Sequence, residues 1–532
     1  HFIDRMDIKG VTGDIIPTDI KPYPREQAAQ WLADVDTLQL GENDRRLLDL
    51  LRYQIDDDYV PEEQRKGLWK YVYRNRRDFL HYRTEKDSLF RVYLNPILYL
   101  SGGLELPQDE GLDNQILYRN GRGASLRGGL FGKVGFYTHF YDNQARYPYF
   151  TQRRTAEFDA LQGAENVKPF GMDGYDFGLV KGYLTYSPIK YLRFKLGRDN
   201  AHFGFGDQSL FLSDYGADYW LFSANLKIWK LEYHYQLTQM TDFIPNKPDQ
   251  VGTFPRKYGV FHMLAFRPDP RVSIALFESV VYASSMPNGR RGFELQYLNP
   301  VIFYRTIEQA IGSPDNALLG LQAKANIIRH FQLYGQFLLD DLNIAETQNG
   351  SGWWGNKFGY QLGLKWIDIF GIQTLDAQVE YNRVRPYVYA HFNTSSNYLH
   401  YNQFLGHDYG ANLSDIGLTA RYRPHHRVFL DAKFRLIKQG RDAAGGRDLN
   451  YGWDPRLSDV THDNGLADPR FGNETLQGQV RTIKYLQAGI RYRIMRLHAW
   501  VEAEAFWRDD AGQRSLGGGI TVRYSVPGQN LR

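Results

Sequence analysis

The sequence of 532 residues contains no cysteine. Structural disulfides, cysteine-ligated zinc, thiol catalysis and a lipidated N-terminal cysteine are therefore all excluded. No stretch approaches the roughly 18 uncharged apolar residues of a membrane-spanning helix, so a helical membrane protein is excluded as well. The net charge of +4 is small against 64 basic and 60 acidic residues, and we expect no nucleic-acid partner.

Catalytic signatures are also lacking. The chain has no G-x-S-x-G elbow, no H-E-x-x-H and no phosphate-binding glycine loop. Asp376 and Glu380 share one face of a predicted strand but lie roughly 13 Å apart at strand rise, which is too far for an acid–base pair. The acid-rich stretch Asp454–Glu474 does not match the spacing of an EF-hand. We therefore expect no enzyme activity, no catalytic residue, no cofactor and no metal site.

What the sequence does contain is a repeated amphipathic hairpin, seen most clearly at Asp415–Ile437. In its first arm Ile416 and Leu418 alternate with Thr419 and Arg421, and the second arm repeats the alternation after a tight turn at Arg423–Arg427. Since side chains of a strand point to opposite faces in turn, each arm is predicted to be a strand with one apolar and one charged face.

Arms of this kind recur from Ser88 to the C-terminus, and short turns alternate with long polar connections. The long connections are residues 142–176, 199–217, 241–256, 283–315, 342–355, 385–412 and 439–480. Short turns on one side and long loops on the other are typical of outer-membrane barrels, in which the short turns are periplasmic. The fold class predicted is an all-β membrane protein, a roughly 18-stranded antiparallel transmembrane β-barrel in the bacterial outer membrane, surrounded by lipid and lipopolysaccharide.

The alternation also predicts which side chains face lipid and which face the lumen. The outward set is Val134, Phe136, Phe140, Leu192, Phe194, Leu196, Leu231, Tyr233, Tyr235, Leu237, Leu375, Ala377, Val379 and Tyr381. The inward set is Arg193, Lys195, Glu232, His234, Asp376, Gln378, Glu380 and Asn382. Because polar lumen residues alternate with apolar ones, a mean hydropathy of -0.51 is compatible with membrane insertion.

The N-terminal part has a different pattern. Residues His1–Ile20 show no clear period and are predicted to form an extended lead. Pro24–Trp69 is predicted to form a module of about three short helices, the third of them at residues 61–69. We thus expect a lead and periplasmic helical module over residues 1–87 and the barrel over residues 88–532.

Two long loops are candidate ligand sites. The first, Arg198–Tyr215, offers Asp199, Asn200, His202 and Asp207. The second, Tyr387–Asn412, offers Tyr398, His400, Tyr401, His407, Asp408 and Tyr409. Aromatic rings interleaved with amides and carboxylates suit sugars, which present C–H faces for stacking and hydroxyls for hydrogen bonds. The same residues could instead pack an inward-folded loop that plugs the barrel, and the sequence leaves both interpretations open.

Three short motifs resemble the Wzi-type family of capsule assembly barrels. They are Trp31-Leu32-Ala33-Asp34 in the helical region, His202-Phe203-Gly204-Phe205-Gly206 followed by Ser209-Leu210 and Asp214, and Phe404-Leu405-Gly406-His407-Asp408-Tyr409-Gly410. The resemblance implies an 18-stranded barrel, closed to free diffusion by its loops, that acts as a lectin and helps to retain capsular polysaccharide at the cell surface. Similar barrels of gliding bacteria, the RemB type, share the layout.

Three other functions remain open at this stage. About 18 strands leave an aqueous bore if nothing fills it, so a diffusion porin for small solutes is the first alternative. A barrel subunit of a secretion or gliding-motility assembly, with other outer-membrane or periplasmic proteins as partners, is the second. An outer-membrane hydrolase is the third, and no motif supports it.

Overall fold

A computed structural model describes most of the chain. The described residues are 1–12, 16–55, 78–84, 89–109, 111–165, 167–243, 254–286, 289–290, 292–299, 315–442, 449–460, 464, 468–494 and 499–525. The third helix expected at residues 61–69 lies outside them.

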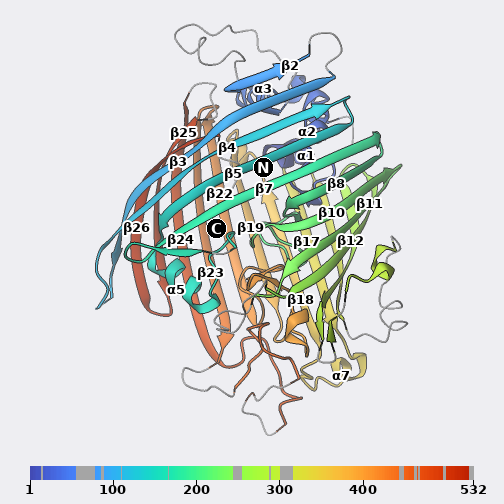
Figure 1. Cartoon of the computed structure of the whole chain (residues 1–532), viewed down its shortest axis with the longest axis vertical. Coiled ribbons are helices and arrows are strands. Elements are labelled where there is room, and N and C mark those ends of the chain that lie inside the picture. Colours follow the sequence, from blue (N-terminus) through green and yellow to red (C-terminus); the bar gives the residue numbers. More distant parts are fainter. Residues whose placement is uncertain are drawn as a thin grey trace.

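Eighteen long antiparallel strands close into a barrel (Figure 1). The first nine are β3 (Phe90–Pro107), β4 (Gln115–Leu130), β5 (Val134–Arg146), β7 (Gly174–Ile189), β8 (Leu192–Asp199), β10 (Tyr219–Ile228), β11 (Leu231–Thr241), β12 (Arg256–Asp269) and β13 (Val272–Ala283). The other nine are β16 (Asn316–Ile327), β17 (Phe331–Asp341), β18 (Lys357–Trp366), β19 (Leu375–Val384), β22 (Leu413–His425), β23 (Val428–Arg441), β24 (Gln479–Ile494), β25 (Ala499–Asp510) and β26 (Gln513–Tyr524). Two short strands, β2 (Leu80–Arg83) and β6 (Lys168–Phe170), pair with β3 and β7.

The barrel closes because the last strand pairs with the first. β26 runs antiparallel to β3 with Leu516 opposite Leu106 and Tyr524 opposite Leu98. Closure leaves no unpaired sheet edge, which a strand-built structure in lipid requires. The predicted fold class is therefore confirmed.

The connections are short at one end and long at the other, as predicted. Helices α5 (Tyr149–Phe158) and α7 (Ile344–Gln348) belong to the long-loop end, and the N-terminal helices gather at the short-turn end (Figure 1). A representative tight turn is Trp229-Lys230 between β10 and β11, where Trp229 takes a positive φ of 55°. The turn that follows β24 lies outside the described residues.

The outer face of the barrel carries an apolar belt. Leu196, Leu362, Val379 and Ile520 are all exposed, and their neighbours along each strand point inward. Exposed apolar side chains at alternate positions of adjacent strands are what a lipid-facing barrel wall requires. Within the described part of the chain, no helix is both long and apolar enough to cross a membrane.

One predicted lipid-facing residue, Tyr235, is buried. Its hydroxyl donates to the carbonyl oxygen of Tyr297 at 3.0 Å, and loop helix η2 (Leu295–Leu298) lies against it. Tyr297 also stacks on Tyr282 of β13 at 5.0 Å. A long loop thus covers part of the outer wall there, which the period-two pattern alone cannot predict.

A charge on the apolar belt is expected to destabilise the barrel in lipid. Val379 is 44% exposed near the middle of β19. Val379→Arg should lower the free energy of unfolding in lipid vesicles by about 2–4 kcal/mol, because it places a cation at mid-bilayer depth. Leu38→Arg is the control, since Leu38 is exposed on the 3₁₀ helix Thr37–Gln39 outside the barrel. Equal urea midpoints for the two variants would contradict the lipid-facing assignment.

Residues 2–9 form a helix, so the prediction of an extended lead is wrong for this part of residues 1–20. Helix α1 (Phe2–Lys9) is followed by α2 (Arg25–Ala33) and α3 (Glu42–Ile55). Phe2 and Met6 pack with Trp31, Leu32 and Leu47 in one apolar cluster. The period was hidden because α1 also buries charged side chains, whose partners come from the barrel wall.

Those partners lie on the lumen face of the strands. Lys365 of β18 bonds to Asp4 at 3.2 Å, and Lys324 of β16 bonds to Asp7 at 2.5 Å. Asp19, farther along the segment, pairs with Arg267 of β12. The segment therefore reaches into the ring of strands from the short-turn end, and inward charges that looked merely solvated are buried ion pairs.

The loop between β8 and β10 also turns inward. Its short strand β9 (His202–Phe203) pairs with β1 (Ile20–Lys21) of the N-terminal segment. Inward-facing Glu380 of β19 accepts the backbone N–H groups of Asp207 at 2.9 Å and Gln208 at 3.0 Å. This inward folding places Asp207 beside the cavity described next.

Candidate functional site

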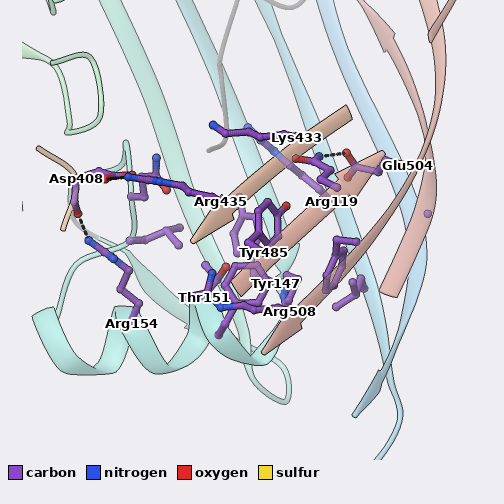
Figure 2. A pocket seen from close by; sticks show the side chains of 18 of the residues that line it. Arg119, Tyr147, Thr151, Arg154, Asp408, Lys433, Arg435, Tyr485, Glu504 and Arg508 are labelled. Carbon is purple, nitrogen blue, oxygen red and sulfur yellow. Dashed lines mark hydrogen bonds and ion pairs between the residues drawn. The ribbon is translucent and has the colours of Figure 1, made fainter. Parts of the chain in front are cut away.

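A cavity of about 530 Å³ runs along the inner wall of the barrel, from helix α5 at the long-loop end to Asp431, Arg491 and Arg523 close to the short-turn end. Its sides are lumen-facing residues of β3 and β4 and of β22 to β26. Helix α5 and the loop of residues 387–412 supply the rest (Figure 2). A concave site of this volume, lined by rings and a few polar groups, matches the general form of a small-ligand site.

Helix α5 is held in place by capping at both ends. Pro148 precedes its first turn, and the free backbone N–H of Tyr149 donates to the Glu105 carboxylate of β3 at 2.9 Å. A carboxylate at a helix N-terminus satisfies an unpaired donor and complements the helix dipole. Asp159 ends the helix in a left-handed conformation, with φ of 51°. The anchored helix directs Arg154 and Glu157 into the cavity.

The lining is rich in arginine. Its cationic side chains are Arg119, Arg146, Arg154, Arg421, Lys433, Arg435, Arg441, Arg481, Arg491, Arg508 and Arg523. Its carboxylates are Glu157, Asp207, Asp408, Asp431, Glu502, Glu504 and Asp510. Among the described residues, eleven cations thus face seven carboxylates, a surplus of four.

Aromatic rings lie between these charges. The ten rings on the wall are Tyr99, Tyr118, Tyr147, Phe150, Phe158, Tyr215, Phe404, Tyr409, Tyr485 and Phe506. Phe150 packs edge-on against Phe506 at 5.8 Å between centroids, and the Arg508 guanidinium lies 4.5 Å from the Phe150 ring. These contacts hold the rings and guanidinium groups in fixed orientations, so the wall is arranged before any ligand arrives.

The centre of the network is Arg435 of β23. It donates to both Asp408 oxygens at 2.5 and 2.6 Å and to Asp415 of β22 at 2.8 Å. Burial would raise the pKa of Asp408, but the nearby Arg435 outweighs burial and holds that pKa well below its usual value. Asp408 is therefore a carboxylate that fixes its loop to the barrel wall, as the dashed lines of Figure 2 show.

Tyr409 lies among three arginines. Its hydroxyl accepts from Arg508 at 3.1 Å, and the guanidinium groups of Arg154 and Arg435 lie 4.4 and 5.3 Å from its ring. Burial alone would raise the pKa of Tyr409, but the charges of Arg508, Arg154 and Arg435 lower it. The local potential at this wall is thus strongly positive.

Three of the ten residues predicted from the sequence lie on the cavity wall: Asp207, Asp408 and Tyr409. Asp207 faces Arg421 at 3.4 Å and Lys433 at 3.8 Å. The structure therefore brings the two predicted loops together at one site, through these residues.

The other residues predicted in the second loop hold that loop in place. Tyr398 is fully buried and donates to the carbonyl oxygen of Phe211 at 2.7 Å. His407 is also buried, with Nε2 at 3.2 Å from Asp415. Tyr401 takes a positive φ of 49° and packs on Phe243 at 5.8 Å. Within the described residues, none of the three lines the cavity.

His400 tethers the loop as a neutral imidazole. Its Nδ1 accepts from the backbone N–H of Thr241 at 3.0 Å, and its Nε2 donates to the carbonyl oxygen of Asp218 at 3.3 Å. One acceptor and one donor on the same ring require the neutral form. Burial lowers the pKa of His400 to about 3.

Acid is therefore expected to loosen this loop. The undocked His400 should titrate near 6.5, so between that value and 3 the released loop binds a proton that the docked loop excludes. The free energy of loop docking is unaffected above pH 6.5 and becomes less favourable by about 2 kcal/mol at pH 5. Amide hydrogen exchange of residues 398–404, corrected for intrinsic rates, measures this loss. His400→Asn should lose this contribution and keep the pH dependence of other buried groups at the loop, such as His391, whose pKa burial also lowers. An unchanged profile would contradict the tether.

Apart from Asp207, the predicted residues of the first loop lie away from the cavity. Asp199 is buried and pairs with Lys181 at 2.5 Å and with Lys195. Asn200 accepts from Lys181 at 3.2 Å. His202 is buried in β9, 3.4 Å from Asp214. A ligand role for these residues stays a prediction, and the contacts seen here are structural.

The sequence reasoning missed most of the cavity wall, including Arg154, Arg441, Arg481 and Arg508. The signal was present, since β23, β24 and β25 place charged residues at alternate inward positions: Arg435 and Arg441, Arg481 and Arg491, Arg508 and Asp510. Loops received the attention because their composition resembles a binding surface. In the part of the chain that the structure describes, no three His, Cys, Asp or Glu side chains are grouped to hold a metal ion.

Comparison with known proteins places the fold. No family model and no curated protein sequence matches the chain. Among solved structures, the chain is similar to Wzi, an outer membrane protein involved in group 1 capsule assembly in Escherichia coli and a carbohydrate binding β-barrel. The match covers 99% of this chain and 98% of that one, with a TM-score of 0.57 and 11% sequence identity. OprD of Pseudomonas aeruginosa is similar over 81% of this chain and 94% of its own, with TM-score 0.42 and 11% identity. OpdK of the same species, solved with vanillate, covers 81% and 98% with TM-score 0.43 and 10% identity. The similarity to Wzi-type barrels that the sequence indicated is thus confirmed for the fold.

Proposed function

We propose that this chain is an outer-membrane barrel that binds surface polysaccharide, such as a capsular polysaccharide, in the cavity of its inner wall. The observation that carries the proposal is the combination of ten aromatic rings with arginines and carboxylates in one cavity of the inner wall. Rings stack on the C–H faces of sugars, and charged groups form directional bonds to hydroxyls. The fold shared with a carbohydrate-binding barrel supports the same function.

In this proposal the long loops are extracellular and the helical module is periplasmic. Inward segments close the lumen between them: the N-terminal segment through Lys324 and Lys365, and the loop of residues 200–218 through Glu380. Separating a buried ion pair of this kind leaves an uncompensated buried charge and is costly. These contacts therefore support a lumen that stays closed. Polysaccharide then reaches the cavity from outside and does not pass through.

Within the cavity, Asp207, Asp408 and Tyr409 stand beside the sugar chain, together with the rings of Tyr485 and Phe506. Tyr398, His400 and His407 hold the loop that carries Asp408 and Tyr409, and so act on binding through position.

The test is binding of the purified full chain to polysaccharide extracted from the surface of its own cells. Tyr485→Ala should weaken binding about tenfold, because one stacking surface is lost. Phe392→Ala is the control, since Phe392 is an exposed ring of the loop of residues 387–412 and does not line the cavity. Unchanged binding by Tyr485→Ala, or no binding by the unaltered chain, would contradict the proposal.

Conductance in planar bilayers separates this function from that of a porin. The unaltered chain should show no steady openings. Large, steady openings would contradict a closed lumen and favour diffusion of small solutes.

A further inference from the structure

We propose that the polysaccharide bound in this cavity is anionic, and that arginines at the long-loop end of the cavity hold a carboxylate or phosphate of the sugar chain. The inference rests on the proposed function and narrows its ligand class. The distribution of charge over the described residues is the starting point.

The wall carries more cations than carboxylates. Eleven cations face seven carboxylates there, and two of the cations, Arg146 and Arg435, also pair with Asp173 and Asp415, which do not line the cavity. Counting these two carboxylates leaves a surplus of two cations. A surplus held inside a partly enclosed cavity, where low-dielectric walls focus the field, attracts anions more strongly than the same charge spread over a surface.

The type of cation also points to an anion with two oxygens. Ten of the eleven cations on the wall are arginines. A guanidinium group presents a planar fork of donors that fits carboxylate and phosphate oxygens in pairs, whereas an ammonium group is a point charge. Six of the seven carboxylates on the wall already pair with arginines, which leaves few free acceptors for the hydroxyls of a neutral glycan.

At the long-loop end, three arginines share two carboxylates. Arg441 of β23 bonds to Glu157 of α5 at 2.5 Å. Arg481 of β24 bonds to Asp510 at 2.6 Å and lies 3.9 Å from Glu157, and Arg508 of β25 lies 3.2 Å from Asp510. One positive charge of this group is thus uncompensated, and the side chain of Arg481 is 27% exposed to the cavity.

Arg154 of α5 adds a further cation beside this group. Its guanidinium donates to the carbonyl oxygen of Asp408 and lies over the ring of Tyr409. The carboxylates that act on its charge, those of Asp408 and Glu157, already pair with Arg435 and Arg441. The lowered pKa of Tyr409 reports the same positive potential. A ligand carboxylate or phosphate placed here would complete the charge balance of the wall.

The experiment compares three forms of one probe with the purified full chain. The probe is the extracted surface polysaccharide, used native, with its carboxyl groups reduced to alcohols, and after chemical removal of phosphate. Native polysaccharide should bind, and either carboxyl reduction or dephosphorylation should weaken binding at least tenfold. The treatment that weakens binding identifies the anion as a carboxylate or as a phosphate. If both treated forms bind as well as the native form, the ligand is recognised as a neutral glycan and the inference is overturned while the proposed function stands. If native polysaccharide does not bind, the proposed function itself is overturned.

Two variants place the anion within the cavity. Arg481→Gln should weaken binding of native polysaccharide about tenfold, because one charge-assisted pair is lost, and should reduce the difference between native and treated polysaccharide. Arg470→Gln is the control, since Arg470 pairs with Asp468 on an exposed loop away from the cavity. Equal binding by both variants would overturn the placement. Unchanged amide exchange of α5 in Arg481→Gln would show that the cavity wall is still folded.

Discussion

Arg435→Gln is expected to release the loop of residues 387–412 from the barrel wall. Arg435 bonds to two carboxylates, Asp408 and Asp415, that are almost fully buried. Removing one partner of a buried charge network leaves uncompensated charges and costs about 3–5 kcal/mol. Because the strands remain paired, the loss should appear locally, as faster amide exchange of residues 398–412 and as loss of polysaccharide binding.

A second variant separates charge from shape at this position. Arg435→Met combined with Asp408→Asn and Asp415→Asn buries no charge and should recover part of the protection, because an uncharged network avoids the desolvation cost. Arg470→Gln, on an exposed loop, should leave the exchange of residues 398–412 unchanged. Full protection of the loop in Arg435→Gln would show that Asp408 and Asp415 are not held by this residue.

Arg5→Gln is expected to release helix α1 from the lumen. The Arg5 guanidinium is fully buried and bonds to Asp44 at 3.0 Å, to Asp368 at 2.9 Å and to Asp376 of β19. Burial would raise the pKa of Asp368, but Arg5 and Lys9 together lower it to about 2. Losing the central cation should cost about 3 kcal/mol or more, although Lys9 still contacts Asp44 and Asp368.

The readout for Arg5→Gln is twofold. Amides of residues 2–9 should exchange faster, and a fraction of channels in planar bilayers should open if the N-terminal segment helps to close the lumen. Arg46→Gln, which removes an exposed pair with Glu42 on α3, should change neither. If the amides of α1 exchange freely and the bilayers still show no openings, the loops alone close the barrel.

The strands were predictable from the sequence because the alternation of apolar and polar residues along each strand matches its lipid-facing and lumen-facing sides. In the hairpin of β22 and β23, Leu418 and Phe434 face lipid while Arg421 and Arg435 face the lumen, as strict alternation predicts. The alternation of short turns with long connections was visible for the same reason, since turn residues and long polar stretches recur along the chain. Neither inference needs knowledge of distant contacts.

Helix α1 could not be predicted because its stability comes from elsewhere in the chain. Eight residues are too few for a stable isolated helix, and its charges are buried against barrel strands more than 300 residues away. From the sequence alone, Asp4, Arg5 and Asp7 look like solvated residues of a lead. Only the closed ring of strands, with Lys324 and Lys365 inside it, turns them into interior ion pairs.

Only part of the candidate site could be predicted from the sequence, for a related reason. The composition of the second loop drew attention to Tyr398 and His407 as well as to Asp408 and Tyr409. Rings and polar groups that suit a sugar equally suit the interior of a folded loop, and the structure uses Tyr398 and His407 in that second way. The arginines of the wall come from three adjacent strands and from α5, so no local stretch of sequence displays them together.

The measurement that tests the central claim most directly uses the absence of cysteine. Thr151→Cys introduces a single thiol on the cavity wall, and Thr347→Cys introduces one on exposed helix α7 (Figures 1 and 2). Rates of labelling by a water-soluble maleimide are then compared with and without polysaccharide from the cells' own surface. The account predicts strong protection at residue 151 and none at residue 347. Equal labelling at residue 151 in the presence and absence of bound polysaccharide would contradict recognition in this cavity.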